Sequence, residues 1–305
     1  MANSSKVNFT KFTQCSTTNV SLEDITCIIT IIINSISCPF TVLLNVLVVL
    51  AVKSRPRLRS NSNILFACIA VTDALTGLIG QPAFILWKIF QLLGDTTSHE
   101  VAVFHNIFVT GVIVSSLLIL TFATFERLVA IKFTMHYFYV ITVRNIKISV
   151  TVFWTFPVIY ALIYISSTQQ GSFLGYIPLF IIVSCLLFIS MAYMILYSET
   201  CRHQKKIKTQ QIPIEEMERF TKENKALKTT AIVVGALIFS FLPVILFLIF
   251  LRVSAFVSLV SIWDPWMRTA AQLNSLCNPL IYCWRQRGIR EFVFRPRNRL
   301  VHPIE

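Results

Sequence analysis

The sequence predicts an all-α membrane protein, a bundle of seven transmembrane helices followed by a short amphipathic eighth helix. Its 305 residues are 55% hydrophobic and only 13% charged, which leaves too little polar surface for a water-soluble globule. The hydrophobic residues gather into seven runs, each near the ~20 residues that a helix needs to cross a bilayer. The Lys and Arg residues that give the net charge of +13 cluster between the runs, as in membrane proteins, so nucleic acid is not an expected partner.

The predicted spans are 25–52, 63–89, 103–131, 146–167, 174–200, 226–251 and 256–283. The connectors after the first, third, fifth and seventh spans are basic, so we expect them to face the cytoplasm. The tail before the first span is then extracellular, and it carries glycosylation sequons at Asn3, Asn8 and Asn19. We therefore expect a multi-pass protein of the plasma membrane with an extracellular N-terminus and a cytoplasmic C-terminus. Its parts are the tail 1–24, the membrane-spanning bundle 25–283 and the segment 284–305, which holds the amphipathic helix and a short cytoplasmic tail.

Asn45 and Asp73 are polar residues inside the first two spans. An Asn in a span commonly donates a hydrogen bond to another helix. A buried carboxylate such as Asp73 requires a cation, a proton or several donors. Helical phase predicts that Asp73 meets Ser116 and the seventh-span residues Asn274 and Asn278. Their oxygen atoms suit a sodium ion, and a hydrated polar network without an ion is the alternative.

Glu126 and Arg127 stand side by side at the end of the third span. A charge at the bilayer centre costs roughly 2.5–3.5 kcal/mol, so this pair is expected near the membrane boundary or against protein, and it marks a candidate functional site. Pro243 and Pro279 predict kinks in the sixth and seventh spans, because each proline removes a backbone donor.

An intramembrane Asp also marks ion paths, so a transporter or channel with Asp73 on its ion path is the alternative function. The odd number of spans, the lack of an inverted repeat and the lack of a second carboxylate along a route speak against it. An enzyme is not expected, because the sequence has no pair of His at metal-ligand spacing, no nucleophile elbow and no phosphate-binding glycine loop.

Several motifs in order resemble those of the rhodopsin-like (class A) G-protein-coupled receptors, from about Asp24 to Arg295. They are Leu44-Asn45-Val46-Leu47, Ala70-Val71-Thr72-Asp73, Glu126-Arg127-Leu128, Trp154, Lys222-Glu223, Ser240-Phe241-Leu242-Pro243 and Asn278-Pro279-Leu280-Ile281-Tyr282. The resemblance implies a receptor that converts binding of an extracellular ligand into activation of a heterotrimeric G protein. It implies that Arg127 is held at rest by Glu126 and Glu223. The remaining switch residues implied are Tyr193, Phe241, Pro243, Asn278, Pro279 and Tyr282.

The chain departs from the family pattern at several positions. Leu128 replaces the usual Tyr, Phe241 the usual Trp, and Cys185 a common Pro. The usual disulfide from the third span cannot form, because the second extracellular loop has no Cys. These features are similar to those of the branch that holds melanocortin, lysophospholipid, cannabinoid and adenosine receptors. Cys15 and Cys27 lie near the oxidising side, and the sequence leaves open whether they pair.

The resemblance also places a ligand pocket, and most of its residues are apolar. They are His105, Val109, Val112, Ile177, Ile181, Phe241, Val244, Ile245, Arg268 and Gln272. Val109 stands where amine receptors carry Asp and Gln272 where opsins carry Lys, so neither an amine nor retinal is expected. We expect an apolar or anionic small molecule, lipid or peptide, with Arg268 anchoring an anionic group. Alternatively, Arg268 pairs with Asp264, one helical turn away.

The segment after Tyr282 mixes aromatic residues with arginines from Trp284 to Arg295, which predicts an amphipathic helix on the lipid surface. Residues 285–305 contain no Ser or Thr, so phosphorylation there cannot recruit arrestin and we expect weak arrestin binding. No cofactor is expected apart from an allosteric sodium ion.

Overall fold

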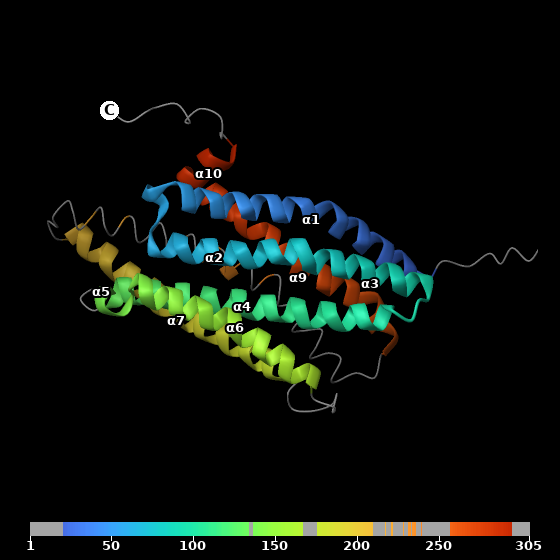
Figure 1. The fold of residues 1–305 in the computed structure, drawn as a ribbon. Helices are drawn as coiled ribbons and strands as arrows, with labels where there is room; N and C mark the ends of the chain where they lie inside the picture. Colours follow the sequence, from blue (N-terminus) through green and yellow to red (C-terminus); the bar gives the residue numbers. More distant parts are fainter. Residues whose placement is uncertain are drawn as a thin grey trace, which may run out of the picture.

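The computed structural model describes residues 21–133, 137–166, 176–209 and 257–294, with eight further residues between 217 and 239. Figure 1 shows long helices packed side by side in one elongated bundle. The long helices are α1 (Leu22–Ser54), α2 (Asn61–Leu75), α3 (Gln81–Leu93), α4 (Ser98–Lys132), α6 (Val143–Ser166), α7 (Ile177–Thr209) and α9 (Val257–Arg285). The short ones are η1 (Pro56–Leu58), the π-helical turn η2 (Thr76–Gly80), α5 (Tyr137–Val140) and α10 (Arg287–Phe294).

Five stretches of the described residues are long and apolar enough to cross a membrane: Leu22–Ser54, Asn61–Leu93, Ser98–Lys132, Val143–Ser166 and Ile177–Arg202. They match the first five predicted spans, with α2, η2 and α3 forming the second span together. The seventh predicted span forms α9, which carries more polar residues, and the sixth lies mostly outside the described residues. The predicted multi-pass helical bundle is confirmed.

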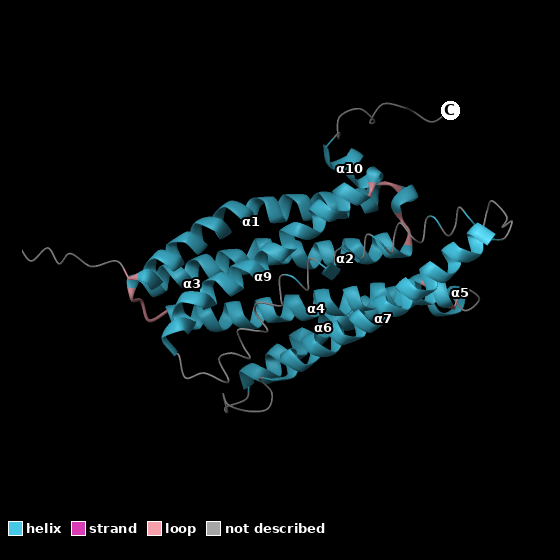
Figure 2. Cartoon of the chain, turned by 180° about the vertical axis from the view of Figure 1, so that it is seen from behind, coloured by secondary structure: helices cyan, strands magenta, loops and turns pink. Residues whose placement is uncertain are grey.

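One face of α1 is polar and buried along almost its whole length. The polar residues recur every three or four positions and are Thr26, Thr30, Asn34, Ser37, Thr41 and Asn45. This column holds α1 against α9, which lies alongside it in Figure 2. The Asn34 amide donates to the Thr269 hydroxyl at 2.9 Å, and the Asn45 amide donates to the Ser275 carbonyl at 3.0 Å. The predicted interhelical hydrogen bond of Asn45 is therefore confirmed.

The column also fixes the second span, through the π-helical turn η2 and the start of α3. The Gln81 amide donates to the Ser37 hydroxyl at 2.8 Å, and the Cys38 thiol approaches the Gly77 carbonyl at 3.1 Å. A Cβ atom on Gly77 would lie 2.9 Å from a methyl group of Val42 and 3.1 Å from that of Thr41. Gly77 thus permits the close approach of α1 to the turn.

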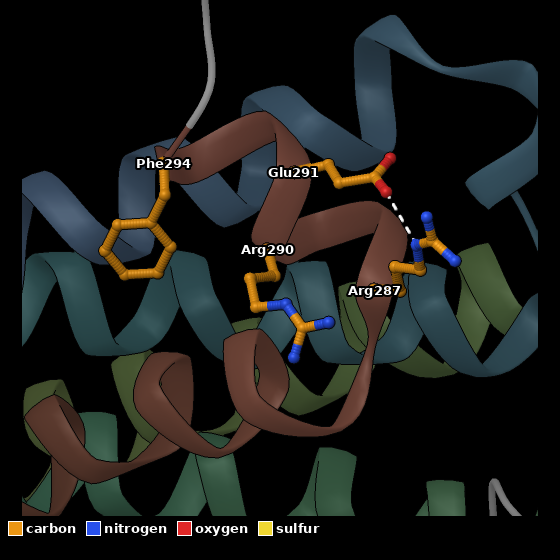
Figure 3. Close-up of a pocket in the computed structure, with 4 residues that line it drawn as sticks. All are labelled: Arg287, Arg290, Glu291 and Phe294. Atoms are coloured by element: carbon orange, nitrogen blue, oxygen red, sulfur yellow. Dashed lines mark hydrogen bonds and ion pairs between the residues drawn. The ribbon is translucent and has the colours of Figure 1, made fainter.

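The predicted amphipathic helix forms as α10, which begins three residues later than expected. Its Ile289 is fully buried, and a Cβ on Gly288 would lie 2.8 Å from Leu58, so the glycine allows α10 to pack on η1. Arg55 donates to the Gly288 carbonyl at 3.0 Å and lies over the ring of Phe292. Figure 3 shows the four residues of α10 that line a pocket of about 480 Å³, which are Arg287, Arg290, Glu291 and Phe294.

Gly77→Val should lower the melting temperature of the purified protein. The added methyl groups collide with α1, and overpacking of this kind costs about 1–3 kcal/mol. Gly235→Val is the matched control, because a Cβ there meets nothing within 4 Å while the intrinsic helix cost of valine is the same. Thermal unfolding followed by tryptophan fluorescence measures both. Equal melting temperatures for the two variants would show that Gly77 is not needed for this packing.

Candidate functional site

The Glu126 and Arg127 pair lies buried at the end of α4. Glu126 is fully buried and Arg127 is 6% exposed. The Arg127 guanidinium donates twice to the Glu126 carboxylate, from Nε to Oε2 at 2.6 Å and from Nη2 to Oε1 at 2.7 Å. Charge-assisted paired contacts of this kind are the stronger hydrogen bonds of proteins. The predicted contact between these two residues is confirmed.

Residues of α2 and α5 enclose this pair. The Ser62 hydroxyl donates to Glu126 Oε2 at 3.2 Å and accepts from Arg127 Nη2. The Tyr137 hydroxyl donates to Glu126 Oε1 at 2.7 Å, and the Asn61 amide donates to the Tyr137 hydroxyl at 3.0 Å. We call these five residues the Arg127 cage. Asn61, Ser62 and Tyr137 could not be predicted as members of this site, because their contacts depend on how separate helices pack.

Tyr137 is a hydrogen-bond donor at neutral pH. It lies in α5, outside the membrane-spanning helices, and burial followed by the nearby Glu126 carboxylate raises its pKa to about 12. The phenol therefore keeps its proton well above physiological pH. Together with Ser62 of α2 and Arg127 of α4, Tyr137 of α5 therefore donates a hydrogen bond to the Glu126 carboxylate.

The other predicted switch residues are only partly described. Tyr282 is fully buried, and its ring stacks on Phe66 with centroids 4.9 Å apart. Its hydroxyl has no hydrogen-bond partner among the described residues. Tyr193 packs against the core from α7, and Pro279 lies within α9. Glu223, Phe241 and Pro243 lie outside the described residues, so their roles stay predictions.

Asp73 meets α9 in the middle of the bundle. Asp73 is 3% exposed, and the Asn278 amide donates to its Oδ2 at 2.8 Å. Ser275, which is 6% exposed on the same helix, also lies near this carboxylate. Asn274 is buried on the same helix, whereas no hydrogen bond joins the half-buried Ser116 to Asp73 in the described part of the chain. The structure thus brings together Asp73 and Asn278 and adds Ser275, which the sequence reading did not select.

A second polar cluster lies near the start of α4, where α3 and α9 meet it. We call it the outer cluster, after its predicted side of the membrane, and it consists of Trp87, Lys88, His105, Asn106, Asp264, Arg268 and Gln272. His105 and Gln272 are buried, with their Nε2 atoms 2.8 Å apart. About 33 Å of helix separates His105 from Arg127, at ~1.5 Å per residue. The outer cluster and the Arg127 cage therefore occupy opposite ends of the bundle.

Arg268 forms the pair that the sequence offered as the alternative to a ligand anchor. Its Nε lies 2.9 Å and 2.8 Å from the two oxygens of Asp264, and its Nη1 donates to Asn106 Oδ1. Lys88 is buried beside it, at 3% exposure. The Lys88 ammonium lies 4.0 Å from the centre of the Trp87 ring, 3.0 Å from Gln91 Oε1 and 4.0 Å from Asp264 Oδ2.

The remaining pocket predictions divide into four groups. Val109 faces the π-helical turn η2, since a Cβ on Gly80 would lie 3.2 Å from it. Val112 lies elsewhere than expected, in an apolar cleft of about 540 Å³ between α2, α4 and α6 whose rim residues Phe104, Val158 and Leu162 are exposed. Ile177 and Ile181 are half-buried at the start of α7. Phe241, Val244 and Ile245 lie outside the described residues.

The tail predictions also lie mostly outside the described residues, which begin at residue 21. This applies to Asn3, Asn8, Asn19 and Cys15. Cys27 is buried in α1 and its thiol is free.

Long apolar helices form the bundle, with the Arg127 cage at one end and the outer cluster at the other. This arrangement agrees with a match to one protein family. The family model of the 7 transmembrane receptor (rhodopsin family) matches residues 44–282, which is most of the chain. The chain belongs to this family. It is therefore a membrane receptor of the G-protein-coupled class that acts in signal transduction. No curated protein matches the chain.

The family match bears on the alternative function. A rhodopsin-family receptor needs no ion path through the bundle, so the transporter interpretation of Asp73 gains no support. The matched range includes both the Arg127 cage and the outer cluster. This receptor therefore has, within its family domain, one polar site at each end of the membrane-spanning bundle.

Tyr137→Phe should lower the melting temperature, because it removes the hydroxyl that donates to Glu126 and accepts from Asn61, a loss of about 0.5–1.5 kcal/mol. Tyr139→Phe is the matched control, since Tyr139 is 84% exposed. Burial raises the Tyr137 pKa from its usual 10 to about 12, so the contribution is complete below pH 10 and is lost as the pH rises through 12. Melting curves at pH 7 and about pH 9 should thus show the same difference from wild type. A difference that vanished at the higher pH would contradict this assignment.

Proposed function

We propose that this receptor converts binding of an extracellular ligand into nucleotide exchange on a heterotrimeric G protein, with the Arg127 cage as its switch. The observation that carries the proposal is that the Arg127 guanidinium is engaged by Glu126 and Ser62 within the bundle. A guanidinium held in this way is withheld from a partner protein. Separation of the helices that form the cage would free it to bind one.

The energetics of the cage suit a switch. Breaking a buried ion pair by removing one partner costs about 3–5 kcal/mol, because a charge is left uncompensated. A docking G protein can provide a new partner for that charge. Moving a two-state equilibrium from 1:99 to 99:1 takes about 5.5 kcal/mol of differential binding. The ligand and the G protein together must supply it through unequal affinity for the two states.

The proposed orientation places the cage at the cytoplasmic end of the bundle. The end of α1, the end of α4 and the start of α10 lie at the cage end of the bundle in Figure 1. The sequence there is basic, with Arg55, Arg57, Lys132 and Arg287, and basic segments between spans mark the cytoplasmic side. The N-terminal tail is then extracellular, with Asn3, Asn8 and Asn19 available for glycosylation. The receptor is proposed to reside in the plasma membrane, with α10 against the cytoplasmic lipid surface.

We also propose that Asp73 binds an allosteric sodium ion in the resting state. Asn278 donates to one oxygen of this carboxylate, and the Oδ1 atoms of Asn278 and Asn45 are buried without a hydrogen-bond partner among the described residues. Buried acceptors of this kind are the ligands that a hard cation requires. Asn274 and Ser116 remain proposed members of the same site. A ligand-free receptor would be stabilised by the ion.

The ligand is proposed to be an apolar or anionic small molecule, a lipid or a peptide. The apolar residues Val109, Ile177 and Ile181 and the cation of Arg268 support this range. Arrestin binding is proposed to be weak, because residues 285–305 offer no Ser or Thr. The shared sequence features favour the branch that includes melanocortin, lysophospholipid, cannabinoid and adenosine receptors.

Purified receptor in nanodiscs should accelerate GDP dissociation from a heterotrimeric G protein when a panel of lipids, peptides and nucleosides is added. Arg127→Ala should lose this acceleration, because it removes the group that meets the G protein. Arg57→Ala is the matched control, since it removes an exposed guanidinium of η1. Labelled GDP release from each Gα class measures the effect. Failure of every ligand on every Gα class would refute the proposal.

Sodium should raise the melting temperature of the wild-type receptor in comparison with N-methylglucamine at equal ionic strength. At ten times the dissociation constant the ion adds about 1.4 kcal/mol. Asp73→Asn keeps the side-chain shape and should abolish the sodium effect. Asp95→Asn, in the exposed turn between α3 and α4, should retain it. A sodium effect that survives Asp73→Asn would place the ion elsewhere.

A further inference from the structure

The outer cluster holds two cations against one carboxylate. Lys88 and Arg268 both face Asp264, and the shorter contacts of Asp264 are those to Arg268. The Lys88 ammonium is 4.0 Å from the carboxylate, and its close contacts among the described residues are the Gln91 side-chain oxygen and the Trp87 ring. Buried charges are normally paired, because desolvation of an ion costs several kcal/mol. Lys88 therefore lacks a close counter-ion of its own.

Among the described residues, no other acidic side chain forms an ion pair with Lys88. The stretches 1–20, 167–175 and 240–256, which the sequence predicts on this side, lie outside the described residues and contain neither Asp nor Glu. The remaining acidic residues of this side have other positions or partners. The Asp24 carboxylate accepts from the Ser21 backbone N–H in the capping box of α1, and Asp95 accepts from Thr97 in the turn before α4. Glu23 accepts from Ser261, and Glu100 lines the apolar cleft beside α6. The described part of the chain thus leaves the outer cluster with two cations, Lys88 and Arg268, and one carboxylate, Asp264.

We propose that the ligand carries a carboxylate which binds between Lys88 and Arg268 and displaces Asp264, the carboxylate that occupies this place at rest. This inference rests on the proposed receptor function and names the chemical class of the ligand. Asp264 acts as a tethered competitor. The ligand must outcompete it, and Asp264 therefore sets the concentration at which the receptor responds.

The two cations are held in place before any ligand arrives. The Lys88 Nζ lies 4.0 Å and the Arg268 Cζ 5.0 Å from the centre of the Trp87 ring. Such cation–π contacts fix the spacing of the charges, and preorganised charges bind more tightly because less freedom is lost on binding. The Arg268 and Asp264 side chains are 32% and 29% exposed, so a ligand can reach them from outside.

The geometry of Arg268 also allows a free carboxylate to bind its guanidinium more strongly than Asp264 does. Its Nε contacts Asp264 while its Nη1 donates to Asn106. A guanidinium binds a carboxylate most strongly through two parallel N–H groups. A ligand carboxylate that is not restrained by the α9 backbone can adopt that paired geometry. The free carboxylate can thus gain contacts that Asp264 does not make.

The test measures equilibrium binding of two probe pairs to receptor in nanodiscs, with empty nanodiscs subtracted. Laurate is compared with dodecanol, and N-acetyl-leucyl-phenylalanine with its C-terminal amide. Asp264→Asn should bind at least one carboxylate probe about tenfold more tightly than wild type, while the neutral partner is unchanged. The pair that responds tells whether the carboxylate belongs to a lipid chain or to a peptide end.

Added to Asp264→Asn, either Lys88→Gln or Arg268→Gln should remove the gain. Asp95→Asn removes an equal but exposed charge and should give none. Melting curves establish folding, and Asp264→Ser serves if Asp264→Asn does not fold. The proposal is overturned if neither carboxylate probe binds the Asp264 variant more tightly, if the neutral probes gain equally, or if the gain survives either Lys88→Gln or Arg268→Gln. Binding needs no G protein, so failed GDP release would refute the proposed function separately.

Discussion

Polar groups that enter a lipid bilayer on a helix must find their hydrogen-bond partners inside the protein, because the hydrocarbon offers none. This constraint determines how the helices of the receptor are rotated. Asn34 reaches Thr269, Asn45 reaches Ser275, and Asn278 reaches Asp73. Each bond joins segments about 200 residues or more apart in the chain, and an unmet amide in its place would cost several kcal/mol. The polar residues therefore select one packing among the many that apolar surfaces alone would allow.

The same constraint makes the Arg127 cage sensitive to helix position. Its donors to Glu126 come from α2, α4 and α5, and hydrogen bonds weaken steeply when their distance or angle changes. A small relative shift of these helices therefore loosens several bonds together. Apolar contacts are less directional, so they can slide without a comparable loss. The cage thus responds to helix movement more sharply than the hydrophobic core around it.

Much of this organisation could be predicted from the sequence, because hydrophobic runs report membrane spans directly. Helical phase also predicted the meeting of Asp73 with Asn278, and four-residue spacing offered the pairing of Arg268 with Asp264. The contacts of Ser62 and Tyr137 could not be predicted, because phase gives the direction of a side chain on its own helix but not the neighbour opposite it. The polar column of α1 was missed although its period of three or four residues was visible in the sequence.

Lys88 illustrates a different limit on prediction. The π-helical turn η2 lies between Asp73 and Lys88, and such a turn adds a residue to one helical turn. Positions after it are rotated relative to a regular α-helix. For this reason the face of α3 could not be deduced from the face of α2, and neither could the burial of Lys88. Val112 shows a related limit, since its position on α4 suits either the bundle interior or the cleft beside α6.

The distribution of hydrogen bonds along α9 indicates where this helix can move. Its outer and middle parts are tied to α1 through Thr269 and Ser275. Beyond Pro279, which removes a backbone donor, Tyr282 packs on Phe66 by ring stacking, and its hydroxyl has no hydrogen-bond partner among the described residues. A displacement of Asp264 is opposed along α9 by the hydrogen bonds that Thr269 and Ser275 make with α1. Few of the described hydrogen bonds oppose a displacement of the inner end of α9. Among the described residues, the interhelical hydrogen bonds of α9 thus precede Pro279, and its inner end, on the side of the bundle where the Arg127 cage lies, is held by apolar packing.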